Sequence, residues 1–236
     1  VATAHGMAWG LLADLAAYDF GYIGLVELTE RVERVFDTTS RLARYRGHLL
    51  NWYDTETLRP LPPAYVSTVD SGNLAGALLV LRQGFLALPE RPVIGPNALD
   101  GLRDTLAQLH EYLPTDQPPQ SLAALDALLE HTPTTIGEYR ALLVELIDTA
   151  NTVPPQPQLA EPWRGRLLRQ ATGLLDDLRT LLPDGAGDQE APPALRDAPG
   201  ATALLARQAA LAEAALARFE AMDFSFLYDT QRRLFV

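Results

Sequence analysis

The sequence predicts an all-α fold made of antiparallel helix pairs. Apolar residues make up 47% of 236 residues, which is enough to bury a sizeable core. Leucine and alanine recur at helical spacing through most of the chain, and short segments rich in proline or glycine interrupt them. Because consecutive helices joined by short loops usually pack antiparallel, the pattern indicates a series of helical hairpins.

The first two helices are expected at 3–17 and 24–45. Gly21, in the stretch YDFGY, separates them, since glycine adopts backbone angles that other residues avoid. The second has the clearest period, with one apolar arc formed by Leu25, Leu28, Val32, Val35 and Leu42. Arginines and glutamates share its other side. They form either a solvated face of ion pairs or a patch for an acidic ligand.

The segment from Gly47 to Gly76, GHLLNWYDTETLRPLPPAYVSTVDSGNLAG, departs from this helical pattern. A helix at 73–88 follows it and is apolar nearly all round, which is typical of a helix buried on most sides. We expect Asp70 or Ser71 to be its N-cap, with a side-chain oxygen on an unpaired backbone N–H. The stretch PERPVIGPN ends this helix, because proline cannot continue it.

The rest of the chain is expected to be mostly helical. Predicted helices lie at 97–112, 120–131, 135–150, 163–182 and 201–222. Thr135 and Glu138 have the spacing of a capping box. The stretches 151–162 and 183–200 are rich in proline and are predicted to be flexible segments. The end, DFSFLYDTQRRLFV, changes period and predicts a short β-hairpin. We treat 1–236 as a single helical domain or a fragment of a larger one.

Composition argues against several classes of function. The net charge of −11 repels phosphate backbones, so we expect no nucleic-acid partner. The chain has no cysteine, and its four histidines lack metal-ligand spacing, so we expect neither a metal nor a cofactor. No apolar run approaches the ~20 residues needed to cross a bilayer, and the start does not resemble a signal peptide. We therefore expect the piece to be soluble.

The segment beginning at Asn51 has the residue types of a carbohydrate site. A saccharide offers an axial C–H face and an edge of hydroxyl groups. Trp52 and Tyr53 supply flat rings with one polar atom each, and Asp54 can accept charge-assisted hydrogen bonds from hydroxyls. The prolines that follow stiffen the chain and reduce the entropy lost on binding. The predicted substrate-binding residues are Asn51, Trp52, Tyr53, Asp54, Asp70, Ser71 and Asn73.

Each of these residues also has a purely structural interpretation. Trp52 and Tyr53 fit core packing, Asp54 fits a turn, and Asp70 and Ser71 fit a helix cap. Asp54 and Asp70 could also form a catalytic carboxylate pair, since glycoside chemistry needs two carboxyl groups ~5.5 Å apart for retention or ~6.5–9.5 Å apart for inversion. The residues themselves leave these alternatives open.

Three stretches carry a resemblance to a known family. LLADLAAYDFGY, RYRGHLLNWYDTETLRPLPPAYVSTVDSGNLAG and MDFSFLYDTQRRLF together resemble the central, glycoamylase-like region of cyclic β-1,2-glucan synthases. The resemblance covers the first 88 and the last 14 residues well, and 89–222 mainly by helical character. One departure is the opening VATAHGMAWG, where the family has a Ser-Pro-Thr-Asn-Ile-Gly type of start.

This resemblance implies a fold and a role. The chain would be the N-terminal part of that region and roughly half of an (α/α)6 toroid. The parent would be a large enzyme of the bacterial inner membrane, with β-1,2-linked glucan and the remaining domains as partners. The chain would contribute to glucan binding and ring-closing transglycosylation, with the main catalytic residues outside it. An uncovered apolar flank would favour self-association.

Two other functions remain open. The chain could be a non-catalytic glucan-binding or structural module of the same large protein. It could also be a protein-interaction array whose acidic surface docks a partner.

Overall fold

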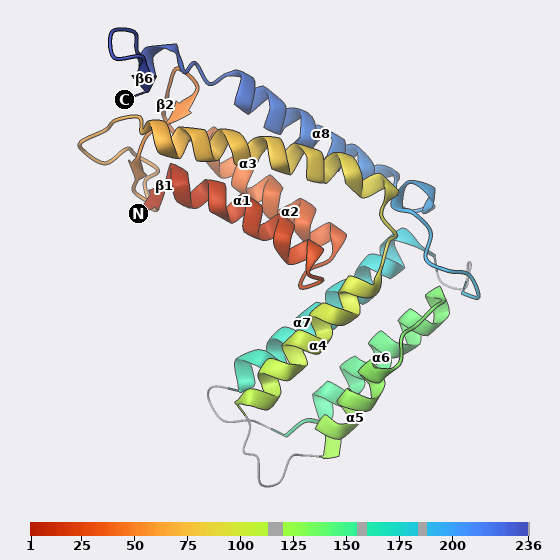
Figure 1. Ribbon diagram of the computed structural model, residues 1–236. Coiled ribbons are helices and arrows are strands. Elements are labelled where there is room, and N and C mark those ends of the chain that lie inside the picture. Colours follow the sequence, from red (N-terminus) through yellow and green to blue (C-terminus); the bar gives the residue numbers. More distant parts are fainter. Residues whose placement is uncertain (113–119, 155–159, 184–187, 236) are drawn as a thin grey trace. The chain divides into compact units, whose positions relative to one another are not determined.

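In the computed structural model, residues 1–112, 120–154, 160–183 and 188–235 are described (Figure 1). They form eight α-helices and short strand pairs, which confirms the all-α class. The helices are α1 (Ala4–Asp19), α2 (Leu25–Ser40), α3 (Thr68–Ala87), α4 (Pro96–Glu111), α5 (Gln120–Glu130), α6 (Ile136–Thr152), α7 (Glu161–Leu181) and α8 (Thr202–Glu220). Short 3-10 turns lie at Leu88–Glu90, Leu195–Asp197 and Ser225–Leu227.

The chain divides into two compact units. Unit 1 comprises Val1–Ala16, Thr29–Leu88 and Leu204–Val236, and unit 2 comprises Ala17–Leu28 and Pro89–Ala203. Unit 1 therefore holds most of α1 and α2 together with α3 and α8, whereas unit 2 holds α4 to α7. Of the predicted flexible segments, 155–159 and 184–187 lie outside the described residues.

The helices of unit 1 form two parallel pairs. The amide of Asn73 on α3 meets His5 at the start of α1, and Gly84 near the end of α3 lies against Leu15. Because the contacts advance together along both helices, α1 and α3 run parallel. The same argument applies to α2 and α8, where Gln208 donates to Thr29 and, further along both helices, Arg218 donates to the carbonyl oxygen of Phe36. Figure 1 shows α1 and α2 running antiparallel, so the pairs alternate in direction.

Three short antiparallel strand pairs lie at one end of unit 1, where α1 and α3 begin (Figure 1). They are β1 (Ala2–Thr3) with β4 (Trp52–Tyr53), β2 (Arg44–Tyr45) with β3 (His48–Leu49), and β5 (Tyr228–Asp229) with β6 (Leu234–Phe235). The pair β5–β6 confirms the hairpin predicted at the C-terminus. Pairing of β1 with β4 ties the segment around residue 52 to the start of α1.

The predicted helix at 24–45 is wrong at its end, because α2 stops at Ser40 and the chain turns into β2. The turn between β2 and β3 contains Arg46 and Gly47, with φ of 47° and 82°. A Cβ on Gly47 would collide with the backbone oxygen of Ala221. The helix therefore ends, and the chain continues as a tight β-hairpin that packs against the segment after α8. The periodicity of 24–45 does not reveal this contact.

The predicted N-cap of the third helix is also wrong. Ser67, not Asp70 or Ser71, is the N-cap: its backbone is extended, and its hydroxyl accepts from Asp70 N at 3.2 Å. The helix begins five residues earlier than expected, and Asp70 lies in its first turn, where a carboxylate complements the helix dipole. Ser71 points inward and is buried.

The stretch 68–90, which includes α3, has the length and mean hydropathy of a membrane span. Our expectation that no segment has these properties does not hold for it. However, 44% of the most apolar 18 residues of this stretch are buried inside the protein. Core helices of soluble proteins can have the same length and mean hydropathy. The prediction that this helix is buried on most sides is wrong, because only one face of α3 is buried and Leu79, Val80 and Leu86 are exposed.

Unit 2 is built from antiparallel helices. Thr105 on α4 bonds to Gln170 on α7, and Tyr112 at the end of α4 stacks on Trp163 near the start of α7, so these two helices run in opposite directions. Helix α6 packs between α5 and α7. The predicted capping box at its start is confirmed, since the hydroxyl of Thr135 accepts from the backbone N–H of residue 138.

Candidate functional site

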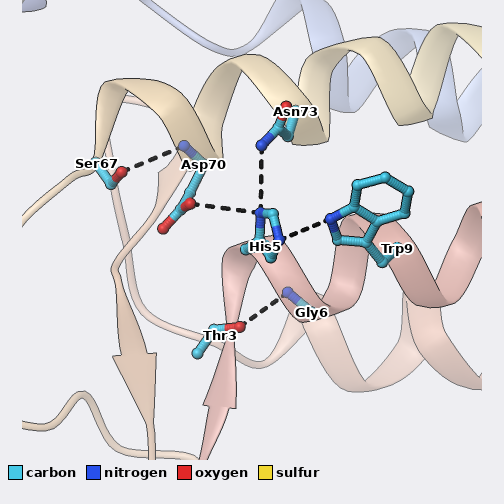
Figure 2. A network of polar contacts seen from close by, with 7 residues as sticks. All are labelled: Thr3, His5, Gly6, Trp9, Ser67, Asp70 and Asn73. Carbon is cyan, nitrogen blue, oxygen red and sulfur yellow. Dashed lines mark hydrogen bonds and ion pairs between the residues drawn. The ribbon is translucent and has the colours of Figure 1, made fainter.

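The candidate site lies where α1 and α3 begin side by side in unit 1 (Figure 2). Each helix is capped by a hydroxyl: Thr3 Oγ1 accepts from Gly6 N at 2.8 Å, and Ser67 caps α3. Two capped helix ends therefore present their first turns to each other. We call His5, Trp9, Asp70 and Asn73 the His5 cluster.

His5 is the centre of this cluster (Figure 2). Its Nε2 accepts from the indole N–H of Trp9 at 2.7 Å. Because that N–H can only donate, the neutral imidazole carries its proton on Nδ1. Nδ1 lies 3.6 Å from Asp70 Oδ1 and 3.2 Å from the side-chain amide of Asn73, and a protonated Nδ1 donates to that amide when its oxygen is turned toward the ring. The three partners fix the orientation of the ring.

The His5 cluster is open to solvent. Trp9 is 58% exposed, and His5 and Asn73 are exposed as well. Asp70 is partly covered, with 27% of its side chain accessible. Trp9 meets the imidazole edge-on, with ring centroids 5.8 Å apart. The cluster thus combines an exposed indole with groups that donate and accept hydrogen bonds.

A second exposed tryptophan lies nearby. Trp52 pairs with Thr3 through β4 and β1, which places it beside the cap of α1. It is 39% exposed and meets the ring of Tyr65 edge-on, with centroids 6.0 Å apart. We call Trp9, Trp52 and Tyr65 the aromatic rim. It adds apolar ring surface around the polar cluster at this end of unit 1.

Three predicted site residues are buried beneath this surface. The hydroxyl of Tyr53 donates to Ala43 O at 2.6 Å and accepts from Leu50 N at 2.7 Å. Asn51 accepts from the backbone N–H of Tyr65 at 3.2 Å. Together with buried Ser71, these residues hold the loop in place and do not present their side chains to solvent.

Asp54 is engaged in its own turn. One carboxylate oxygen accepts from Thr57 N at 2.7 Å, from Thr57 Oγ1 at 2.9 Å and from Glu56 N at 3.0 Å. These hydrogen bonds, first of all that from the backbone of Thr57, lower the pKa of Asp54. A carboxyl group with a lowered pKa stays ionised and is a poor proton donor.

The structure therefore separates the predicted residues into two groups. Trp52, Asp70 and Asn73 lie at the exposed surface, whereas the buried or turn-bound residues support it. Sequence reasoning did not place His5 or Trp9 in the site. Their spacing of four places both on one helix face and was the available signal. Among the described residues, no group of three potential ligands could hold a metal ion.

Comparison with known proteins supports the resemblance predicted from the motifs. No family model matches the chain. The chain is 33% identical over 244 aligned residues to the cyclic beta-(1,2)-glucan synthase NdvB of Rhizobium meliloti (strain 1021). The match covers 95% of this chain, so it extends through 89–222, where the motifs are weak. The chain spans only 8% of the length of that protein.

Proposed function

We propose that this chain is part of a cyclic β-1,2-glucan synthase and that the His5 cluster and the aromatic rim bind β-1,2-linked glucan. One observation carries the proposal: exposed aromatic rings lie beside a polar cluster at the end of unit 1 where two helices begin. The similarity to a glucan synthase favours this polymer among carbohydrates.

The chemistry of the surface suits a sugar chain. The axial C–H face of a glucose unit packs on an indole, as Trp9 and Trp52 allow, and such rings offer a large contact area. Asp70 accepts hydrogen bonds from hydroxyls, and charge-assisted bonds of this kind are stronger than neutral ones. Asn73 both donates and accepts. Because His5 already orients both side chains, little side-chain entropy is lost on binding.

Binding is better supported than catalysis. Transfer of a glycosyl group requires two suitably spaced carboxyl groups. Among the described residues of the cluster, Asp70 is the carboxylate that lies beside His5. Asp54 stays ionised, because the hydrogen bonds of its own turn lower its pKa. We therefore assign glucan binding to this chain and ring closure to the longer polypeptide, with reacting carboxylates elsewhere in it.

The surrounding protein is part of the same proposal. The alternation of parallel helix pairs in unit 1 is what layers of an (α/α) toroid would require. In such a fold the ends of like-directed helices face one cleft, and the His5 cluster would lie at its mouth. The parent would be anchored in the bacterial inner membrane, and its remaining domains would be the partners of this piece.

Isothermal titration with linear β-1,2-glucooligosaccharides tests the binding site. We expect Trp9→Ala and Asp70→Asn to weaken binding at least about tenfold, which corresponds to ~1.4 kcal/mol. The matched control is Glu213→Gln, an exposed carboxylate on α8 of the same unit, which should bind like the unchanged protein. Equal affinities for all four proteins would refute the site.

The same titration separates the alternative functions. A non-catalytic glucan-binding module would bind the sugar through these residues, yet Asp70→Asn in the longer polypeptide would leave transglycosylation intact once the site is saturated. A protein-interaction array would show no heat with glucan at all. Loss of transglycosylation at saturating glucan would support a direct part in ring closure.

A further inference from the structure

A second hollow with the composition of a carbohydrate site lies on unit 2. It has a volume of about 420 Å³, within the range of about 300–1,000 Å³ typical of small-molecule sites. Its walls come from the turn between α1 and α2, from α4 and from the start of α7. The lining residues are Tyr22, Asp104, Thr105, Ala107, Gln108, Trp163 and Arg166. None of them belongs to the His5 cluster or the aromatic rim.

Two aromatic rings line this hollow. Tyr22 is 39% exposed, and its hydroxyl donates to Asp104 Oδ2 at 2.9 Å. That hydrogen bond raises the pKa of Tyr22, so the phenol remains neutral. Trp163 stacks nearly parallel to Tyr112, and the guanidinium of Arg166 lies 5.2 Å from its ring centroid. Both rings are thus held by polar or stacking partners at the edge of the hollow.

A buried network holds the wall that carries Tyr22. Gln170 on α7 receives a hydrogen bond from Thr105 at 2.8 Å and donates to Gly21 O at 2.7 Å. Gly21 has a φ of 75°, and a Cβ there would collide with the backbone of Asn97. The turn is therefore locked onto α4 and α7, and Tyr22 is positioned before any ligand arrives.

The polar groups of the hollow select a neutral ligand. Asp104 offers an acceptor, Arg166 offers donors, and Gln108 offers both. A carboxylate and a guanidinium on the walls of one hollow disfavour a strongly anionic or cationic ligand, because either would meet a like charge. A sugar ring satisfies acceptors and donors through its hydroxyls and the aromatic walls through its C–H face.

We propose that this hollow binds one sugar residue of a neutral carbohydrate. The inference goes beyond the proposed function, since it concerns a separate surface in the other unit. The chain would then have two sugar-binding surfaces, one at the His5 cluster and one at this hollow.

Indole signals in a two-dimensional nitrogen–proton NMR spectrum test the proposal. The chain has three tryptophans, so each indole N–H gives an assignable peak. Methyl β-glucoside and linear β-1,2-glucooligosaccharides are the probes. We expect the Trp163 peak to move saturably with both. Asp104→Asn should weaken this response at least about fivefold, and Tyr22→Phe should weaken it as well.

Two matched variants control for indirect effects. Asp148→Asn removes an exposed carboxylate from α6 of the same unit and should leave the Trp163 response unchanged. Trp9→Ala should also leave it unchanged. A Trp163 peak that stays still while the Trp9 and Trp52 peaks move would overturn this inference and leave the proposed function standing. Movement of the Trp163 peak alone would support this inference and contradict the proposed glucan site at the His5 cluster.

A charged probe tests the class of ligand. Sodium glucuronate has the ring of glucose with a carboxylate in place of the hydroxymethyl group. We expect it to act more weakly than methyl β-glucoside because of Asp104. A response to glucuronate without one to the glucoside would mean that Arg166 makes an anion site, and the assignment to neutral carbohydrate would be rejected.

Discussion

At the scale of single residues, the hydroxyl of Tyr53 joins two stretches of backbone beneath the candidate site. It donates to Ala43 O and accepts from Leu50 N, and the ring is fully buried. Tyr53→Phe leaves both backbone groups without this partner, so we expect a loss of about 1–3 kcal/mol in the free energy of unfolding. Urea denaturation measures this loss. Tyr45→Phe, at an exposed tyrosine, is the control and should change stability by less than about 0.5 kcal/mol. Equal stabilities of the two variants would contradict the assigned role.

Asp177 makes the stability of the protein depend on pH. It lies on α7, and its carboxylate accepts from Val26 N at 3.3 Å, in the first turn of α2. Burial raises the pKa of Asp177 from 3.8 to about 7, against the opposing effect of its hydrogen bonds to the backbone. The folded state therefore holds a proton that the unfolded state releases at lower pH.

The sign of the effect follows from this difference. Between about pH 4 and pH 7 the folded state binds more protons at Asp177, so its contribution to stability falls by ~1.4 kcal/mol per pH unit and levels off above pH 7. Asp177→Asn removes this contribution. Urea denaturation from pH 4 to pH 8 should show the unchanged protein losing stability relative to the variant over that interval. Parallel curves would exclude the effect.

At the scale of elements, glycines with opposite surroundings offer a test of how the turns are built. Gly21 has a positive φ and touches the backbone of Asn97, whereas Gly173 lies within α7 with open space around it. We expect Gly21→Ala to destabilise the protein by at least about 2 kcal/mol, from the φ cost of ~1–2 kcal/mol and the collision. Gly173→Ala should stabilise it by ~0.5–1 kcal/mol, because alanine favours helix. Thermal unfolding compares the two. A shift of the same sign for both would show that the turn is not locked.

The helices themselves were largely predictable, and their ends were not. Periodicity predicts a helix at each place where the described residues form one, because it depends on which face of a helix is buried. The confirmed capping box at Thr135 depends on residues three apart, which sequence shows directly. The end of α2 and the start of α3 were wrong. One depends on the close approach of Gly47 to the chain after α8, and the other on a choice between neighbouring hydroxyls at Ser67 and Ser71.

At the scale of the whole molecule, an exposed apolar surface on unit 1 predicts self-association. Leu79, Val80 and Leu86 on α3 are exposed, and Trp9 on α1 is exposed as well. Apolar side chains exposed together on a protein surface commonly mark interaction sites. We expect sedimentation velocity to show concentration-dependent association that Val80→Glu reduces. The control Val144→Glu, at an exposed position on α6, should leave association unchanged. A protein that stays monomeric at every concentration would contradict the predicted self-association.

The sequence alone determined the fold class, the positions of the helices, the C-terminal hairpin and the resemblance to glucan synthases. These depend on local spacing and on long motifs, which are visible in one chain. It also drew attention to Trp52, Asp70 and Asn73. Only the tertiary structure decided that Asn51, Tyr53 and Ser71 are buried and that His5 is the centre of the cluster. The physical reason is that His5 meets partners more than sixty residues away, and such a contact exists only after α1 and α3 have packed in parallel.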